Sequence, residues 1–234
     1  MSASIATIVF ARFDSSRLPG KVLLPIMGRP MLGRVFDRLR RARRAGELIL
    51  ATSERNVDDP LVAFAAKESL GCFRGAFEDV TGRALSCAVA AGASRFVRIS
   101  GDSPFIDPEL LDEMVELHER SGAELTTNLH PRSYPPGVSI EVIEISAFRR
   151  LIDEVPTNKE REHVTLHFYR NADHYRIVNH TVAGDQYAGV SLVVDTPGDL
   201  LRAVWITERL GLRPEAASLQ EVVDLARQWQ AEAV

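Results

Sequence analysis

Short, mostly apolar segments alternate with longer segments of helical periodicity along the chain. Runs at 5–10, 48–51 and 96–99 have the composition of strands buried on both faces of a sheet. Between the first two, apolar residues at helical spacing from Met31 to Leu39 predict a helix that packs on the sheet. Strands separated by helices in this way indicate an α/β fold, in which a Rossmann-like, mostly parallel sheet is flanked by helices.

Capping residues predict where the later helices begin. Asp58-Asp59 precedes Pro60, Asp107 precedes Pro108, and Thr196 precedes Pro197, and each pairs a cap residue with a proline that can open a helix. We therefore expect a helix after each of them. A last helix is expected from Ser218, with Glu221 completing a capping box.

The segment 131–137 contains three prolines and a glycine and gives the strongest loop signal in the chain, which suits a lid or a binding loop. The residues at 138–142 alternate like a half-exposed strand. No internal repeat or linker-like segment divides the chain, so we expect a single domain over residues 1–234 with a small antiparallel subregion at about 130–190. The other elements expected in this half are strands at 125–127 and 191–194 and helices at 146–154 and 160–169.

Composition excludes two classes of function. With 28 basic and 32 acidic side chains the formal net charge is −4, so there is no overall positive field for nucleic acid. The longest nearly apolar run, at 5–11, is far shorter than the roughly 20 residues of a membrane span. A basic run from Arg38 to Arg44 is interpreted as a solvated helix end. The two cysteines, Cys72 and Cys87, are too few for a disulfide scaffold and lack metal-ligand spacing, so we expect free thiols in apolar surroundings. This usage fits a reducing cytosol, and we expect a cytoplasmic protein.

A cluster of cations and hydroxyls follows the first predicted strand. It consists of Arg12, Ser15, Ser16, Arg17 and Lys21. Ligands of open α/β sheets bind at the carboxyl ends of strands. There, arginine, lysine and loop amides can hold a triphosphate and stabilise a departing pyrophosphate. The alternative interpretation is a surface loop with solvated charges.

This stretch resembles the signature of the cytidylyltransferases, specifically the spore coat polysaccharide F-like proteins related to CMP-KDO and CMP-acylneuraminate synthetases. Two positions depart from that signature. Phe10 stands where relatives commonly have Gln or Pro, and Asp14 stands where a small residue is usual. Further blocks follow in family order over nearly the whole chain, at 51–53, 73–75, 78–83, 98–104, 161–165 and 194–200.

The resemblance implies a nucleotide-diphospho-sugar transferase fold and a CTP-dependent nucleotidyltransferase. The hydroxyl of a small acidic sugar would attack the α-phosphate of CTP, releasing pyrophosphate and leaving a CMP-sugar for surface polysaccharide biosynthesis. The resemblance also implies catalytic roles for Arg12, Arg17, Lys21 and Asp102. The residues implied to bind the nucleotide are Ala11, Arg12, Ser15, Arg17, Lys21, Ser53, Arg74, Arg83 and Gly101.

Two aspartates end predicted strands that lie far apart in the sequence. Asp102 follows the strand at 96–99 through a turn at Gly101, and Asp195 ends the strand at 191–194, so both can reach one rim of the sheet. Mg²⁺ needs few protein carboxylates, because water and substrate phosphates complete its shell. The resemblance assigns both aspartates to a divalent cation, Mg²⁺. Taken singly, each would be interpreted as a helix cap or a turn residue.

The second substrate is expected to bind beyond the nucleotide half, within residues 134–165. Sugar hydroxyls and carboxylates need polar partners, and this segment offers Tyr134, Glu141, Arg161, Glu162 and His163. An exposed helix face, with His163 paired to a neighbouring glutamate, is the alternative. Relatives use this subregion for dimer packing, and we therefore expect a two-fold homodimer.

Two other functions stay open from the sequence. A GT-A-type glycosyltransferase usually carries Asp-x-Asp at its metal strand, whereas this chain has Asp102-Ser103-Pro104, which disfavours it. A non-catalytic nucleotide-binding homologue would keep the fold without turnover, and Phe10 and Asp14 are the features that point to it.

Overall fold

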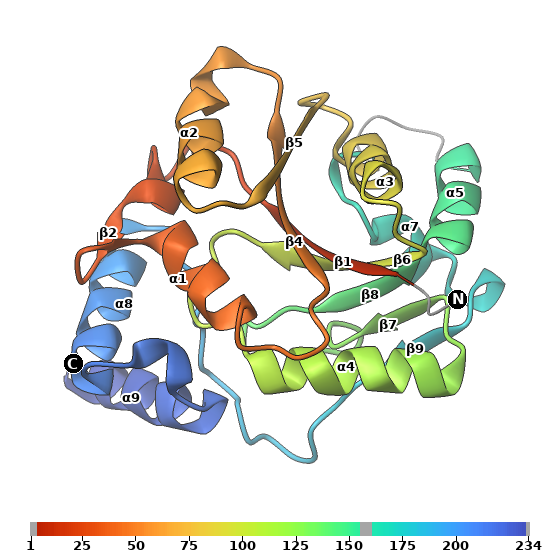
Figure 1. The fold of residues 1–234 in the computed structure, drawn as a ribbon. Coiled ribbons are helices and arrows are strands. Elements are labelled where there is room, and N and C mark those ends of the chain that lie inside the picture. The colour runs from red at the N-terminus through yellow and green to blue at the C-terminus, as the bar shows by residue number, and fades with distance from the viewer. Residues whose placement is uncertain (1–3, 155–160, 233–234) are drawn as a thin grey trace.

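A computed structural model describes residues 4–154 and 161–232 of the chain. Seven strands form one sheet in the order β5-β4-β1-β6-β8-β7-β9 (Figure 1). Strand β8 is antiparallel to both of its neighbours, and the other pairs are parallel. The strands of this sheet are β1 (Ile5–Phe10), β4 (Glu47–Ser53), β5 (Gly71–Gly75), β6 (Arg95–Ser100), β7 (Leu125–Thr127), β8 (Glu141–Glu144) and β9 (Ile177–Asn179).

A second, two-stranded antiparallel sheet joins β2 (Pro25–Ile26) to β3 (Arg29–Pro30). The remaining short elements are the 3₁₀ helices η1 (Lys21–Leu23), η2 (Asn56–Asp58), η3 (Ala172–His174) and η4 (Pro214–Ala216).

Helices cover both faces of the large sheet (Figure 1). One face carries α3 (Val80–Ala90), α5 (Ile145–Glu154) and α7 (Leu166–Arg170). The other face carries α1 (Met31–Leu39), α2 (Asp59–Lys67), α4 (Pro108–Ser121), α8 (Pro197–Leu210) and α9 (Leu219–Glu232). Successive strand residues point to opposite faces. In β1, Ile8 therefore packs on the face covered by α3, α5 and α7, and Val9 packs on the other face. No helix in the described parts of the chain is long and apolar enough to cross a membrane.

The α/β architecture and the parallel pairing of the first three predicted strands are confirmed. The predicted apolar stripe of α1 is fully buried. Two of the predicted caps have the expected hydrogen bonds: Asp107 accepts from the backbone of Leu110 at 2.7 Å, and Thr196 forms a capping box with Asp199. Ser218 and Glu221 bond each other as predicted at the start of α9.

The helix predicted after Asp58 is present as α2, with Asp58 at its N-cap position, but the expected capping hydrogen bond is absent. The Asp58 carboxylate instead accepts from the backbone nitrogen of Phe13 at 2.7 Å and from the hydroxyl of Ser53. These bonds join the loop after β1 to the end of β4, so Asp58 supports the rim of the sheet.

The predicted strand at 191–194 is also wrong. This segment is extended, but it bonds to two loops instead of a strand: Leu192 donates to Pro136 at 2.7 Å, and Val194 donates to the carbonyl of Asp102 at 3.0 Å. The chain therefore crosses the rim of the sheet here and brings Asp195 beside Asp102.

Two predictions in the second half of the chain need correction. The strand predicted at 138–142 lies at Glu141–Glu144, and it is buried because β6 and β7 flank it. The helix predicted at 160–169 is interrupted at 163–165, and α7 begins only at Leu166; residue 160 lies outside the described residues.

Arg38 differs from the rest of its basic run. Arg40, Arg41, Arg43 and Arg44 are exposed as predicted, whereas Arg38 is buried. Its guanidinium donates to the carbonyls of Ile106, Pro214 and Ala217 at 2.5, 2.9 and 2.8 Å. Burial lowers the pKa of Arg38. The side chain thus ties α1 to the loops around η4.

Candidate active site

A cavity of about 320 Å³ lies where β1 and β6 end at the rim of the sheet. Cationic and acidic side chains from distant segments meet in it. The lining residues are Phe10, Ala11, Arg12, Ser15, Ser16, Arg17, Lys21, Val22, Val80, Arg83, Arg98, Ser100, Asp102, Glu162, His163 and Asp195.

Lys21 is the most enclosed cation of the loop after β1, with 9% of its side chain exposed. The turn before it requires Gly20, whose φ is 70° and whose missing Cβ would lie 3.1 Å from the ring of Phe13. The ammonium of Lys21 donates to Asp102 Oδ2 at 2.9 Å and to Asp195 Oδ1 at 2.6 Å. It also donates to the carbonyl of Val194 at 3.0 Å. All three of its N–H groups are therefore engaged by protein oxygens.

Asp102 and Asp195 thus lie together, as expected, but a lysine ammonium lies between them. Their other oxygens are engaged as well: Ser100 donates to Asp102 at 2.6 Å, and Arg17 pairs with Asp195 at 2.8 Å. Two carboxylates around one cation position form a pair of hard oxygen donors, which fits Mg²⁺. Within residues 4–154 and 161–232, no group of three or more His, Cys, Asp or Glu side chains could hold a metal ion. A cation held here would complete its shell with water and phosphate.

Arg12 is the most weakly paired of the predicted phosphate-binding residues in the loop. Half of its side chain is exposed, and the nearest carboxylate, Asp14, is 4.0 Å away. Asp14 pairs more closely with Arg55, at 2.5 Å, and Arg55 stacks on the ring of Phe77 at 3.5 Å. Asp14, one of the two departures from the family signature, therefore connects the loop to neighbouring segments and leaves Arg12 available.

Arg83 reaches the same cavity from α3. Its Nη1 donates to the carbonyl of Ala76 at 2.6 Å, and its buried Nε has no hydrogen-bond partner in the structure. Burial lowers the pKa of Arg83. A buried donor without a partner is costly, so this side chain is suited to an anionic ligand.

Three residues predicted to bind the nucleotide lie outside the cavity lining. Ser53 donates to Asp58, and Arg74 donates to the carbonyl of Ser53 at 3.0 Å, so both fasten the end of β4. Gly101 allows a close approach of two chains, because a Cβ there would lie 2.9 Å from that of Ala11. These residues shape the rim behind the cavity.

The predicted sugar-binding residues divide into two groups. Glu162 and His163 line the cavity. Arg161 does not: it pairs with Asp79 at 3.1 Å, and its carbonyl accepts from Thr81.

Tyr134 and Glu141 also lie outside the lining. Tyr134 is buried, and its hydroxyl bonds to Nδ1 of the half-buried His180 at 3.0 Å. Glu141 is buried, with Arg98 on one oxygen at 2.5 Å and the hydroxyl of Tyr169 on the other. Burial and the charge of Glu141 raise the pKa of Tyr169, which therefore stays protonated and donates.

Sequence reasoning missed Arg98 and Ser100 as site residues. Both belong to β6 and line the cavity, and Asp102 follows them. A signal was present in the sequence, because an arginine in the middle of an apolar run predicted to be a central strand needs a polar partner.

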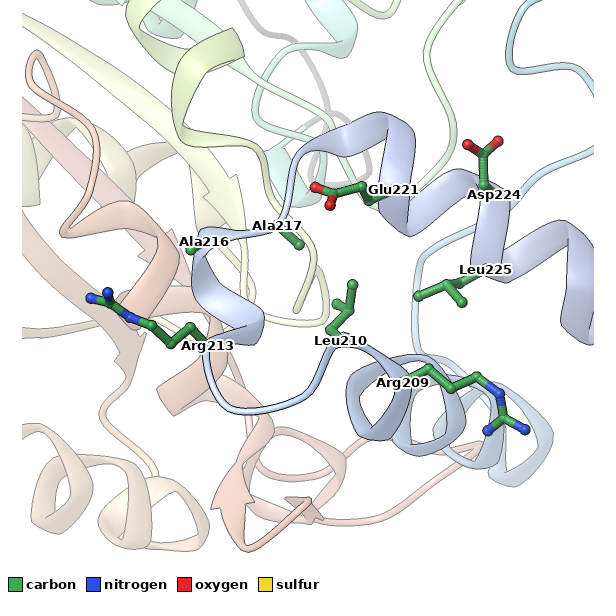
Figure 2. Close-up of a pocket in the computed structure, with 8 residues that line it drawn as sticks. All are labelled: Arg209, Leu210, Arg213, Ala216, Ala217, Glu221, Asp224 and Leu225. Atoms are coloured by element: carbon green, nitrogen blue, oxygen red, sulfur yellow. The ribbon is translucent and has the colours of Figure 1, made fainter.

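The hollow between the end of α8, η4 and α9 is a less suitable site (Figure 2). Arg209, Arg213 and Asp224 point away from one another there. Arg209 stacks on Trp205 at 3.4 Å, and Glu221 is used by the cap of α9. The charged groups of this hollow therefore do not converge on a ligand.

The fold and the cation-rich rim define a nucleotidyltransferase. The chain belongs to the cytidylyltransferase family, whose family model matches residues 6–190. It is similar to the spore coat polysaccharide biosynthesis protein SpsF of Bacillus subtilis, with 32% identity over 235 residues that cover 95% of this chain and 94% of SpsF.

Two solved structures share the fold. A cytidylyltransferase from Leptospira borgpetersenii has a TM-score of 0.89 and 27% identity, covering 99% of this chain and 95% of its own. CMP:2-keto-3-deoxy-manno-octonic acid synthetase, solved with CTP, has a TM-score of 0.66 and 18% identity, covering 88% of this chain and 99% of its own.

Proposed function

We propose that this cytidylyltransferase transfers CMP from CTP to a hydroxyl of an acidic sugar and makes a CMP-sugar for a surface polysaccharide. One observation carries the proposal: Asp102 and Asp195 meet at the cation-rich end of β1, inside the cavity that Glu162 and His163 also line. CTP is the ligand in the solved structure of CMP:2-keto-3-deoxy-manno-octonic acid synthetase, and we propose CTP and an acidic acceptor for this chain by analogy with that enzyme.

In this mechanism the sugar hydroxyl attacks the α-phosphate in line. A new P–O bond forms, the bond to the pyrophosphate oxygen breaks, and the hydroxyl proton leaves to solvent. Arg12, Arg17 and Arg83 hold the phosphates and stabilise the charge that develops on the departing pyrophosphate.

Asp102 and Asp195 are the residues that would hold Mg²⁺, which when bound supplies charge neutralisation on the triphosphate. With a cation on these carboxylates, Lys21 would be free to donate to phosphate oxygens instead. Ser100 keeps Asp102 oriented through the 2.6 Å hydrogen bond. Glu162 and His163 bind sugar hydroxyls on the acceptor side of the cavity.

We also propose that residues 134–165 contribute to a two-fold homodimer. Sedimentation at micromolar concentration tests this part separately, and a monomer there would contradict it.

The enzymatic proposal is tested by incubating the protein and Mg²⁺ with CTP, ATP, GTP or UTP and a panel of acidic sugars that includes 3-deoxy-manno-octulosonate. We expect pyrophosphate release with CTP and a product with the mass of a CMP-sugar. CTP binding without release would favour the non-catalytic homologue. Release of a nucleoside phosphate from a nucleotide-sugar would favour the glycosyltransferase.

A further inference from the structure

Arg98 lies in the active-site cavity but does not belong to the cationic loop after β1. It is contributed by β6, two positions before Ser100 and four before Asp102. Alternate residues of a strand share a face and are about 7 Å apart, so Arg98 and Ser100 form a polar row on one face of the sheet. The row leads from the carboxylate at the rim into the cavity.

Glu141 holds the guanidinium of Arg98 in place. The two residues are directly opposite in the antiparallel register of β6 and β8, and Nη1 of Arg98 donates to Glu141 Oε2 at 2.5 Å. The other oxygen of Glu141 accepts from Tyr169, whose hydroxyl also bonds to Thr127 at 2.8 Å. With 1% of its side chain exposed, Glu141 cannot exchange these partners for water.

The bond to Glu141 uses Nη1 and fixes the orientation of the guanidinium, while Nε and Nη2 of Arg98 do not donate to Glu141. About a third of the Arg98 side chain is exposed, and the cavity is the space that it lines. Planar guanidinium groups with two N–H groups on one edge bind carboxylates in a bidentate manner.

We infer that Arg98 binds the anionic group of the acceptor sugar and thereby selects acidic over neutral acceptors. This inference rests on the proposed function, since it assigns the acceptor's charge to one residue. Glu141 is a positioning residue in this scheme, because it contacts Arg98 and not the substrate.

The spacing along β6 suits this role. The reacting hydroxyl has to approach the α-phosphate near Asp102, and a step of about 7 Å from Ser100 to Arg98 is one that a single sugar unit can span. A neutral acceptor would leave partly buried N–H groups of Arg98 without a partner. Sites built to hydrogen-bond a substrate group reject analogues that lack it.

Arg95 provides a matched control on the same two strands. It is opposite Glu144 in the register, as Arg98 is opposite Glu141, and its Nε lies 3.2 Å from Glu144. Arg95 is not among the residues that line the cavity. Arg95→Met therefore removes a cross-strand arginine–glutamate pair, together with a 3.4 Å contact to Glu119, without touching the site.

The experiment compares wild-type protein with Arg98→Met and Arg95→Met. The acceptors are 3-deoxy-manno-octulosonate and its C1 amide, which keeps the reacting hydroxyl but has no charge. We expect Arg98→Met to raise the KM for the acid about 10- to 100-fold, the loss of a charged hydrogen-bond partner. The KM for CTP and the use of the amide should change less than about twofold, and Arg95→Met should behave as wild type.

A second measurement does not depend on turnover. Saturation-transfer NMR reports binding of the same acid to the CTP-free protein, which should be lost in Arg98→Met and retained in Arg95→Met. Because Arg98→Met leaves the buried carboxylate of Glu141 without its positive partner, the double variant Arg98→Met/Glu141→Gln is included, with circular dichroism to check folding. The double variant should show the same loss of acid binding as Arg98→Met.

Three results from the variants would overturn the inference: equal losses for acid and amide, a rise in the KM for CTP as large as that for the acid, or unchanged binding of the acid. Wild-type protein that uses neutral sugars as well as acidic ones would also overturn it, while cytidylyl transfer would stand. If no acceptor releases pyrophosphate, the proposed function fails, and the NMR comparison still decides whether Arg98 binds the anion.

Discussion

The ammonium nitrogen of Lys21 lies 2.6 Å from a carboxylate oxygen of Asp195, a residue 174 positions further along the chain. The same ammonium contacts Asp102 at 2.9 Å. A residue expected to bind phosphate and two residues expected to bind a cation therefore form one cluster. A lysine that neutralises both carboxylates offsets the repulsion between two like charges held close together. We therefore predict that a divalent cation bound by Asp102 and Asp195 would compete with Lys21 for the same oxygens.

Lys21→Met should increase the affinity of the nucleotide-free protein for Mn²⁺ by about tenfold, because it removes the competing ammonium. Calorimetric titration measures this affinity. Lys67→Met is the control, since it removes the same charge from an exposed position on α2. Equal affinities in wild type and Lys21→Met would contradict the competition.

Asp102→Ala and Asp195→Ala should each lower kcat by orders of magnitude, and the double variant should be little worse than either, because residues of one site act as a unit. The free energy of unfolding should fall by only about 1 kcal/mol, since Lys21 keeps one carboxylate in each variant. Steady-state kinetics and denaturant unfolding measure the two effects. Asp185→Ala, at an exposed position, is the control.

His163→Ala and Arg161→Ala should differ in kinetics. His163 lines the cavity, so its loss should raise the KM for the sugar about tenfold with the KM for CTP unchanged. Arg161 pairs with Asp79 outside the lining, and its replacement should change the sugar KM less than about threefold. A larger effect in Arg161→Ala than in His163→Ala would reverse this assignment.

Glu68 should stabilise the folded protein only at pH values at which its carboxyl group is ionised. Hydrogen bonds from Arg29 lower its pKa below the usual 4.5, so its contribution is present above about pH 4.5 and is lost as the pH falls through the lowered value. Glu68→Gln should reduce the free energy of unfolding by about 1 kcal/mol at pH 7 and by less at pH 3. Urea unfolding at both values measures the difference, which a pH-independent loss would contradict.

The two cysteines should react at different rates. Both are free, but Cys72 is exposed, contrary to the expectation from sequence, whereas Cys87 is buried. Burial raises the pKa of Cys87 to about 12, which leaves little thiolate at neutral pH. Titration with a disulfide reagent should detect one thiol in native protein and two after unfolding. Two fast-reacting thiols in the native state would contradict this.

Local sequence patterns were sufficient to predict the elements whose defining interactions lie between residues close in the sequence. The apolar run of β1 and the capping boxes at Thr196 and Ser218 involve residues only a few positions apart, so burial and hydrogen bonding are encoded locally. The family signature likewise placed the cationic loop at the end of β1.

By itself, then, the sequence determined the α/β class, the position of the Arg12 to Lys21 loop and the family. Tertiary structure alone decided which charges pair. An apolar run at 191–194 looks like a strand, but the fold places it beside two loops, where Leu192 donates to Pro136 and Val194 donates to Asp102. Three ion pairs illustrate this: Lys21 with Asp195, Arg161 with Asp79, and Arg98 with Glu141. Each pair joins residues far apart in the sequence, so it forms only because the fold brings their segments together.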